Sequence, residues 1–131
     1  MTYNNYIHIT DESVLKCLTF GEGRVSFKYG KSQSTTRQTN GNYEQFVSCG
    51  NQKTYDNLET FVLQRLSATT KYTSHSTENY FYINEKCFNG KDIMRKWFDL
   101  QMTILELQQE YHSNKEKYDI EIESVIYDED C

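Results

Sequence analysis

A helical repeat of apolar residues over positions 93–111 constrains the fold of this 131-residue chain more than any other feature. The spacing alternates between four and three residues, which places all members of the repeat on one side of an α-helix. The members are Ile93, Trp97, Leu100, Ile104, Leu107 and Tyr111. The repeat therefore predicts one long helix that follows Gly90 and packs its apolar side against another layer.

The apolar side of this predicted helix is broader than one stripe. Met94, Phe98 and Leu105 flank the repeat, so the helix can pack on a sheet and also meet a second copy of the chain. The repeat is shorter than the roughly three to four heptads that identify a coiled coil, and the chain's own sheet could use all of it. Of a monomer and a homodimer, we expect the homodimer, which would pair through this helix or through a predicted edge strand at residues 119–123.

Segments rich in β-branched and aromatic residues predict a small sheet. Residues 14–20 and 24–29 flank Gly21 and Gly23 and indicate a β-hairpin. Further strands are predicted at residues 43–49, at 80–83 and, along an edge, at 118–123. Residues 30–42 are polar and predict a loop with a short helix, and residues 67–77 predict a loop.

A second helix is predicted from Asp56 to Leu66, with Thr54 or Asp56 as its N-cap. The order of elements predicts an α+β fold: a small mixed sheet, made of the hairpin and further strands, with this helix packed on it and a long C-terminal helix. Residues 1–90 are expected to form the α+β core. Residues 91–131 are expected to add the long helix and an acidic strand to the same compact domain.

Residues 24–29 alternate in polarity, as expected for a strand with one polar and one buried face. The polar positions are Arg24, Ser26 and Lys28, and the apolar positions are Val25, Phe27 and Tyr29. With Lys31 nearby, the polar positions could form a basic face for nucleic acid, with Tyr43 available for stacking. A solvated strand face is the alternative.

Charge is divided unevenly along the chain. Residues 1–97 contain 12 Lys and Arg against 9 Asp and Glu, whereas residues 98–131 contain 2 against 10. The net charge of −5 therefore does not exclude nucleic acid as a partner of the first part. The acidic part could shield a basic face, attract a basic protein or imitate a phosphate backbone.

The sequence shows neither the apolar run of a membrane span nor a signal peptide, so we expect an intracellular protein that is not secreted and does not act at a membrane. The four cysteines form no Cys-x-x-Cys pair, which argues against a zinc site. A disulfide framework is conceivable from their even number, but reduced and partly buried thiols fit the expected compartment better.

Short motifs between residues 14 and 84 resemble the divergent GIY-YIG nuclease-like domain of phages and large DNA viruses. They are, in order, FKYGKS at 27–32, Arg37, YEQFV at 43–47, YDNLE at 55–59 and ENYFYI at 78–83. The resemblance implies metal-dependent hydrolysis of a phosphodiester. Residues 14–20 contain no tyrosine where the family has one, which predicts weak or lost cleavage.

The resemblance also implies roles for individual residues. Glu59 would hold Mg²⁺ or Mn²⁺, Arg37 would contact the scissile phosphate, and Tyr29 would be the hairpin tyrosine of the site. Lys28, Lys31 and Arg24 would bind nucleic acid. Three of these residues also have a purely structural interpretation. Glu59 would complete a capping box, Arg37 would be a solvated loop residue, and Tyr29 would belong to the core.

Two functions are therefore predicted. The first is a viral or phage protein that acts on nucleic acid through a GIY-YIG-like domain, with cleavage either kept or lost. The second is a non-enzymatic accessory protein that binds a host or viral protein through its acidic C-terminal part.

Overall fold

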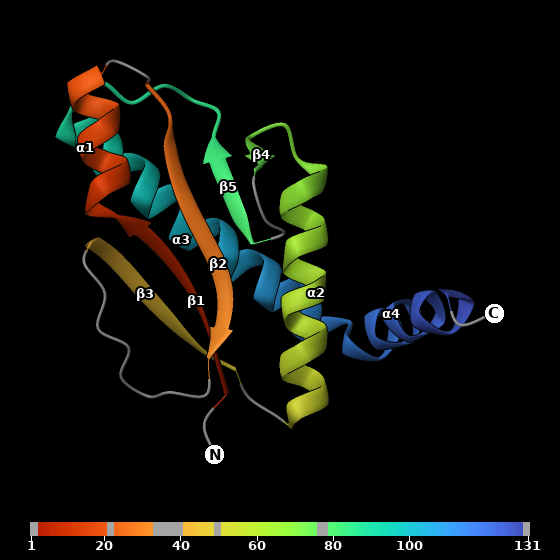
Figure 1. The fold of residues 1–131 in the computed structure, drawn as a ribbon. Coiled ribbons are helices and arrows are strands. Elements are labelled where there is room, and N and C mark those ends of the chain that lie inside the picture. Colours follow the sequence, from red (N-terminus) through yellow and green to blue (C-terminus); the bar gives the residue numbers. More distant parts are fainter. Residues whose placement is uncertain (1–2, 21–22, 33–40, 49–50, 76–78, 130–131) are drawn as a thin grey trace.

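In the part of the chain that the structure describes, the fold is an α+β arrangement of a five-stranded sheet and four helices (Figure 1). The computed structural model describes residues 3–20, 23–32, 41–48, 51–75 and 79–129. The elements are β1 (Tyr3–Thr10), α1 (Asp11–Phe20), β2 (Val25–Ser32), β3 (Gly41–Ser48), α2 (Gln52–Ala68), β4 (Tyr72–Ser74), β5 (Tyr80–Ile83), α3 (Gly90–Ser113) and α4 (Lys115–Glu129). The predicted fold class is confirmed.

The strands follow the order β3-β1-β2-β5-β4, and each neighbouring pair is antiparallel. Strand β1 therefore lies between β2 and β3, although it is first in sequence. Its register pairs Ile7 with Tyr29 of β2 and with Glu44 of β3. The predictions had not included β1, although Tyr6, Ile7, His8 and Ile9 alternate between ring-bearing and β-branched side chains.

One face of the sheet packs against α2 and α3, which together form the core. The buried strand residues on this face include Ile7, Phe27 and Phe81, each at most 1% exposed. Helix α3 crosses behind the strands, and α2 lies beside β4 and crosses the end of α3 (Figure 1). Helix α4 packs against α2 and α3 beyond the sheet.

The prediction of a strand at residues 14–20 is wrong, because this segment lies in helix α1. The Thr10 hydroxyl accepts a hydrogen bond from the Ser13 amide at 3.1 Å and caps the first turn. Val14 and Cys17, three residues apart, face the core, whereas Leu15 is 64% exposed. Strand β2 consequently pairs with β1, and the predicted 14–29 hairpin does not form.

The predicted edge strand at 118–123 is also wrong, because these residues belong to helix α4. Tyr118 and Ile122 are four residues apart and are both buried, whereas Ile120 between them is exposed. The same apolar residues fit both the alternation of a strand and the i, i+4 spacing of one helix face. Helix α4 begins after Asn114, which ends α3.

The other predicted elements form, with shifted ends. Helix α2 begins earlier than expected, because Asn51 rather than Thr54 or Asp56 is its N-cap and accepts a hydrogen bond from the Thr54 amide at 3.0 Å. The predicted loop at 67–77 contains the short strand β4. Residues 30–32 and 41–42 lie in strands, and the rest of the predicted short helix lies outside the described residues.

The long helix α3 packs in the way its repeat predicts. Ile93, Trp97, Leu100, Ile104 and Tyr111 are buried in the core, and Leu107 packs against its margin. The chain's own core therefore uses the whole repeat, which was the alternative to pairing with a second copy. Cys17 and Cys87 are buried as thiols, and the Cys17 thiol donates to the carbonyl of Cys87.

Candidate nucleic-acid interface

The sheet face opposite the core carries aromatic and basic side chains. Alternation along β2 sends Lys28 to this face, while its neighbours Phe27 and Tyr29 point into the core. Lys28 lies between His8 of β1 and Tyr80 of β5 in the sheet register. All three of these side chains are only half-buried, in contrast to the core side. The predicted polar and buried faces of β2 are thus confirmed.

These side chains form a continuous band across four strands, which we call the aromatic strip. It consists of Tyr43, Tyr6, Lys28, Tyr80, Tyr82, His75 and Arg24. The ring centroids of Tyr6 and Tyr43 are 5.5 Å apart. The Lys28 ammonium lies 5.9 Å from the ring centre of Tyr6 and 5.5 Å from that of Tyr80. A cation thus bridges the aromatic rings of β1 and β5.

The β5 end of the strip is a stack of three planar groups. His75 lies parallel to Tyr82 with ring centroids 4.0 Å apart, and the Arg24 guanidinium carbon lies 4.6 Å from the Tyr82 ring centre. The Ser26 hydroxyl is 2.6 Å from the His75 Nε2 atom. These contacts bring the two rings and the guanidinium together at the surface of the sheet.

Gly30 allows the Tyr6 ring to lie flat on the sheet. A Cβ atom at Gly30 would come within 2.8 Å of the Tyr6 hydroxyl oxygen, closer than packed atoms approach. Tyr6 is consequently only 2% exposed and supports the neighbouring rings from below. The glycine of the FKYGKS motif therefore has a packing role.

An open groove of about 630 Å³ adjoins the strip where α1 meets the sheet. It is lined by Thr10, Glu12, Ser13, Lys16, Arg24, Ser26, His75 and Tyr82. The Ser26 amide donates to the Ser13 hydroxyl at 2.9 Å and fixes α1 against the start of β2. Lys16 and Glu12 form an exposed ion pair at 3.3 Å. The groove therefore extends the strip by an ion pair, in which Glu12 offsets the charge of Lys16.

The predicted site residues separate onto two sides of the sheet. Lys28 and Arg24 belong to the aromatic strip. Lys31 lies on the core side, where its ammonium is 2.6 Å from an Asp56 oxygen and 4.0 Å from a Glu59 oxygen. Glu59 therefore does not share a pocket with Lys28. Arg37 lies outside the described residues.

Tyr29 is fully buried in the core, which agrees with the structural interpretation of this residue and not with a role in catalysis. Burial raises the pKa of its phenol far above the usual value, and the nearby Glu59 carboxylate adds to this effect. A phenol in this environment stays protonated and is inaccessible to solvent. Tyr29 is therefore unsuited to deprotonate a water molecule.

Glu59 fits a divalent cation poorly. Its carboxylate and that of Asp56 already face the Lys31 ammonium, and a metal ion would have to displace that cation. Within the described ranges, no group of three or more His, Cys, Asp or Glu side chains is placed to hold a metal. The described residues around Glu59 therefore do not fit the predicted Mg²⁺ or Mn²⁺.

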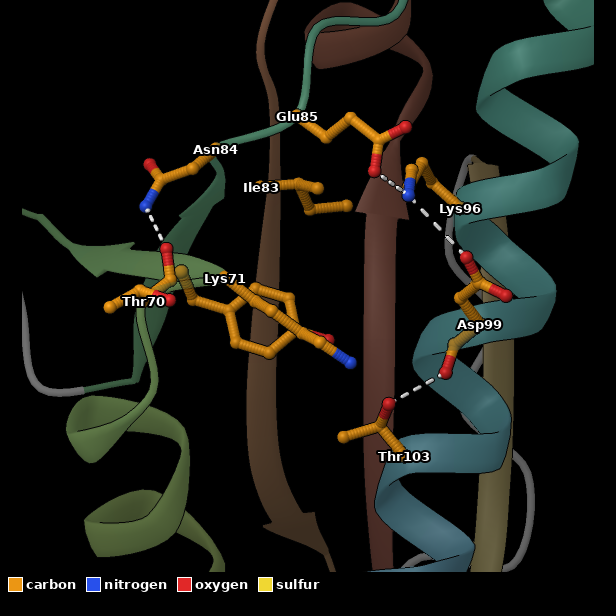
Figure 2. Close-up of a pocket in the computed structure, with 9 residues that line it drawn as sticks. Thr70, Lys71, Ile83, Asn84, Glu85, Lys96, Asp99 and Thr103 are labelled. Carbon is orange, nitrogen blue, oxygen red and sulfur yellow. Dashed lines mark hydrogen bonds and ion pairs between the residues drawn. The ribbon is translucent and has the colours of Figure 1, made fainter.

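A second cavity, of about 360 Å³, lies between β4, the end of β5 and α3 (Figure 2). Lys96 of α3 bonds Glu85 and lies 3.4 Å from an Asp99 oxygen, and the hydrogen bond to Glu85 raises the pKa of Lys96. Asn84 donates to the Thr70 carbonyl at 2.9 Å. These contacts join the segment after β5 to α3 and to the turn between α2 and β4, which indicates a structural role.

Sequence reasoning missed part of the strip. Tyr80, Tyr82 and His75 are not among the site residues predicted above. The i, i+2 spacing within YFYI does place the two tyrosines on one face. By contrast, nothing local in the sequence places His75 on Tyr82, because that stack depends on the pairing of β4 with β5.

A comparison with protein-family models, with curated proteins and with solved structures finds no match. Within the described residues, no helix is both long and apolar enough to cross a membrane. The function is therefore inferred from the geometry of the chain itself.

Proposed function

We propose that this protein binds single-stranded nucleic acid on the aromatic strip. The observation that supports this most strongly is the placement of Lys28 and Arg24 beside the rings of Tyr6, Tyr80 and Tyr82 on a sheet face that the core helices do not cover. Proteins that bind single strands combine stacking rings with cations that follow the backbone. The strip provides both on one face.

The distribution of charge supports the same proposal. Helices α3 and α4 contain nearly all of the acidic part of the chain, and both lie beyond the core face of the sheet. The core therefore separates most of these carboxylates from the strip. A strand bound over Lys28 and Arg24 would meet a locally basic surface despite the net charge of −5, whereas the charge of Lys16 is offset by its ion pair with Glu12.

Tyr80→Ala and Lys28→Gln are each expected to weaken binding of a labelled single-stranded oligonucleotide. Losing one stacked base costs about 1–3 kcal/mol, so we expect a roughly 10- to 100-fold higher Kd for Tyr80→Ala. Lys28→Gln should also reduce the salt dependence of binding, because one phosphate contact disappears. Fluorescence anisotropy at two salt concentrations measures both effects.

Phe88→Ala and Lys117→Gln serve as matched controls, because both side chains lie away from the strip. They are expected to leave the Kd unchanged, and urea unfolding verifies that every variant is folded. Failure of the wild-type protein to bind at low salt would contradict the proposal. So would equal binding by Tyr80→Ala and Phe88→Ala.

We further propose that the domain binds without cutting, which is the degenerate form of the predicted nuclease. Glu59 and Tyr29 lie on the core side, whereas Lys28 and Arg24 lie on the open side. A bound strand is therefore not presented to the carboxylate. Single- and double-stranded DNA should remain intact with Mn²⁺ on a denaturing gel. Cleavage that Glu59→Ala abolishes would restore the nuclease hypothesis.

The second predicted function, binding of another protein through the acidic C-terminal part, is favoured by one observation on α4. Ile120 is exposed there and lies between the exposed carboxylates Glu116 and Glu121. This combination suits a partner with basic and apolar side chains. It becomes the leading hypothesis if the oligonucleotide assay shows no binding.

A further inference from the structure

Helix α3 carries a second apolar stripe that faces solvent. Its members are Met94, Phe98, Met102 and Leu105. Phe98 is 60% exposed and Met102 is 56% exposed, whereas the buried repeat on the other side of the helix contacts the core. We call these four residues the outer stripe. Single exposed apolar side chains are common, but four on one helix face mark an interaction surface.

The outer stripe has the spacing of a helix-packing ridge. Met94, Phe98 and Met102 follow one another at intervals of four residues, and Leu105 follows after three more. Rows of this kind fit into the grooves of a second helix. Because the buried repeat already holds α3 against its own sheet, the outer stripe is available to a helix from outside.

Charges along α3 are ordered so that the helix complements itself in an antiparallel arrangement. Its first half contains the exposed cations Lys91 and Arg95, together with Asp92, Lys96 and Asp99, and its second half contains the exposed carboxylates Glu106 and Glu110 and no Lys or Arg. Glu110 already contacts Arg65 and Tyr118 of its own chain, so the complementarity rests on Arg95 and Glu106. Antiparallel alignment places the basic half of one helix against the acidic half of the other, whereas parallel alignment places like charges together. This order identifies a second copy of the chain as a fitting partner.

We propose that two copies form a dimer by packing α3 against α3 antiparallel, about a two-fold axis near the level of Leu100. In this arrangement Phe98 faces Met102 of the second copy, and Met94 faces Leu105 of the second copy. Arg95 faces Glu106 of the second copy, and the symmetry repeats each of these pairs. The predicted homodimer is thereby assigned to the outer stripe and not to the buried repeat.

Sedimentation equilibrium at micromolar concentration should give about twice the chain mass of 15.6 kDa. Phe98→Glu should yield a folded monomer, because it places a charge at the centre of the contact, and the Kd for dimerisation should rise at least about 100-fold. Leu15→Glu, at a similarly exposed position on α1, is the matched control and should remain dimeric. A wild-type monomer, or a dimeric Phe98→Glu, would overturn the proposal.

Charge reversal tests the antiparallel register. Arg95→Glu alone and Glu106→Arg alone each create two like-charge contacts per dimer, and each should weaken dimerisation by about 10-fold. The double variant restores opposite charges in both contacts and should return the Kd to near the wild-type value. If the double variant is as weak as the two single variants combined, the proposed pairing is wrong.

Discussion

Leu100→Ala is expected to lower the free energy of unfolding by about 2–5 kcal/mol, because it removes buried methyl groups and leaves a cavity. Leu100 is 1% exposed and lies where α3 joins the core. Urea unfolding followed by the fluorescence of Trp97, the single tryptophan of the chain, measures the change. Trp97 is suited to this because it is itself buried on α3.

Leu15→Ala is the matched control for this change. It removes the same atoms from a side chain that is 64% exposed on α1, and it should shift the free energy of unfolding by no more than about 0.5 kcal/mol. Equal effects of the two variants would mean that α3 does not pack on the sheet through its buried repeat.

Asp119→Ala is expected to destabilise the fold by about 2–4 kcal/mol, because it removes the carboxylate that joins α4 to α2 and α3. Its oxygens accept hydrogen bonds from the Tyr111 hydroxyl at 2.5 Å, the Lys115 ammonium at 2.7 Å and the Asn57 amide at 3.0 Å. Denaturant unfolding measures the loss. Glu121→Ala, at an exposed position on the same helix, should have little effect.

Asp119 also gives the stability a defined pH dependence. Burial raises the pKa of its carboxyl group. The hydrogen bonds from Lys115, Tyr111 and Asn57 together lower this pKa by more than burial raises it, so the net pKa lies below the ordinary value of 3.8. The stabilisation is present above pH 3.8 and is lost as the pH falls through the lower folded-state pKa. Asp119→Asn should therefore show a smaller loss of stability on acidification than the wild type.

The spacing of apolar residues predicted correctly those elements whose sequence fits either the helical or the strand periodicity but not both. The repeat of α3 and the alternation of β2 each fit a single periodicity, and both elements form where expected. Residues 14–20 and 118–123 fit two periodicities, because β-branched or alternating residues there also fall at helical spacing. In the fold, Thr10 caps α1 and Asp119 joins α4 to α2, and both contacts favour the helix. The cap at Thr10 spans three residues and was readable as a local N-cap signal, whereas the contact between Asn57 and Asp119 joins distant segments and was not.

The candidate interface was predictable in its charges but not in its full composition. Alternation alone placed Lys28 and Arg24 on the polar face. The neighbours of Lys28 depend on the strand order, which brings Tyr6 of β1 and Tyr80 of β5 to either side of it. That order is set by contacts between distant segments. For the same reason the separation of Glu59 from Lys28 was apparent only in the fold.

The open face of the sheet and the outer stripe of α3 lie on different sides of the molecule, with the core between them. A dimer joined through α3 therefore leaves both aromatic strips accessible, and the assembly is bivalent. When one strip holds a strand, the second meets the rest of the same strand at a high effective concentration. Long oligonucleotides should then bind with an avidity that short ones lack, and Phe98→Glu should remove this difference while preserving the affinity of a single strip.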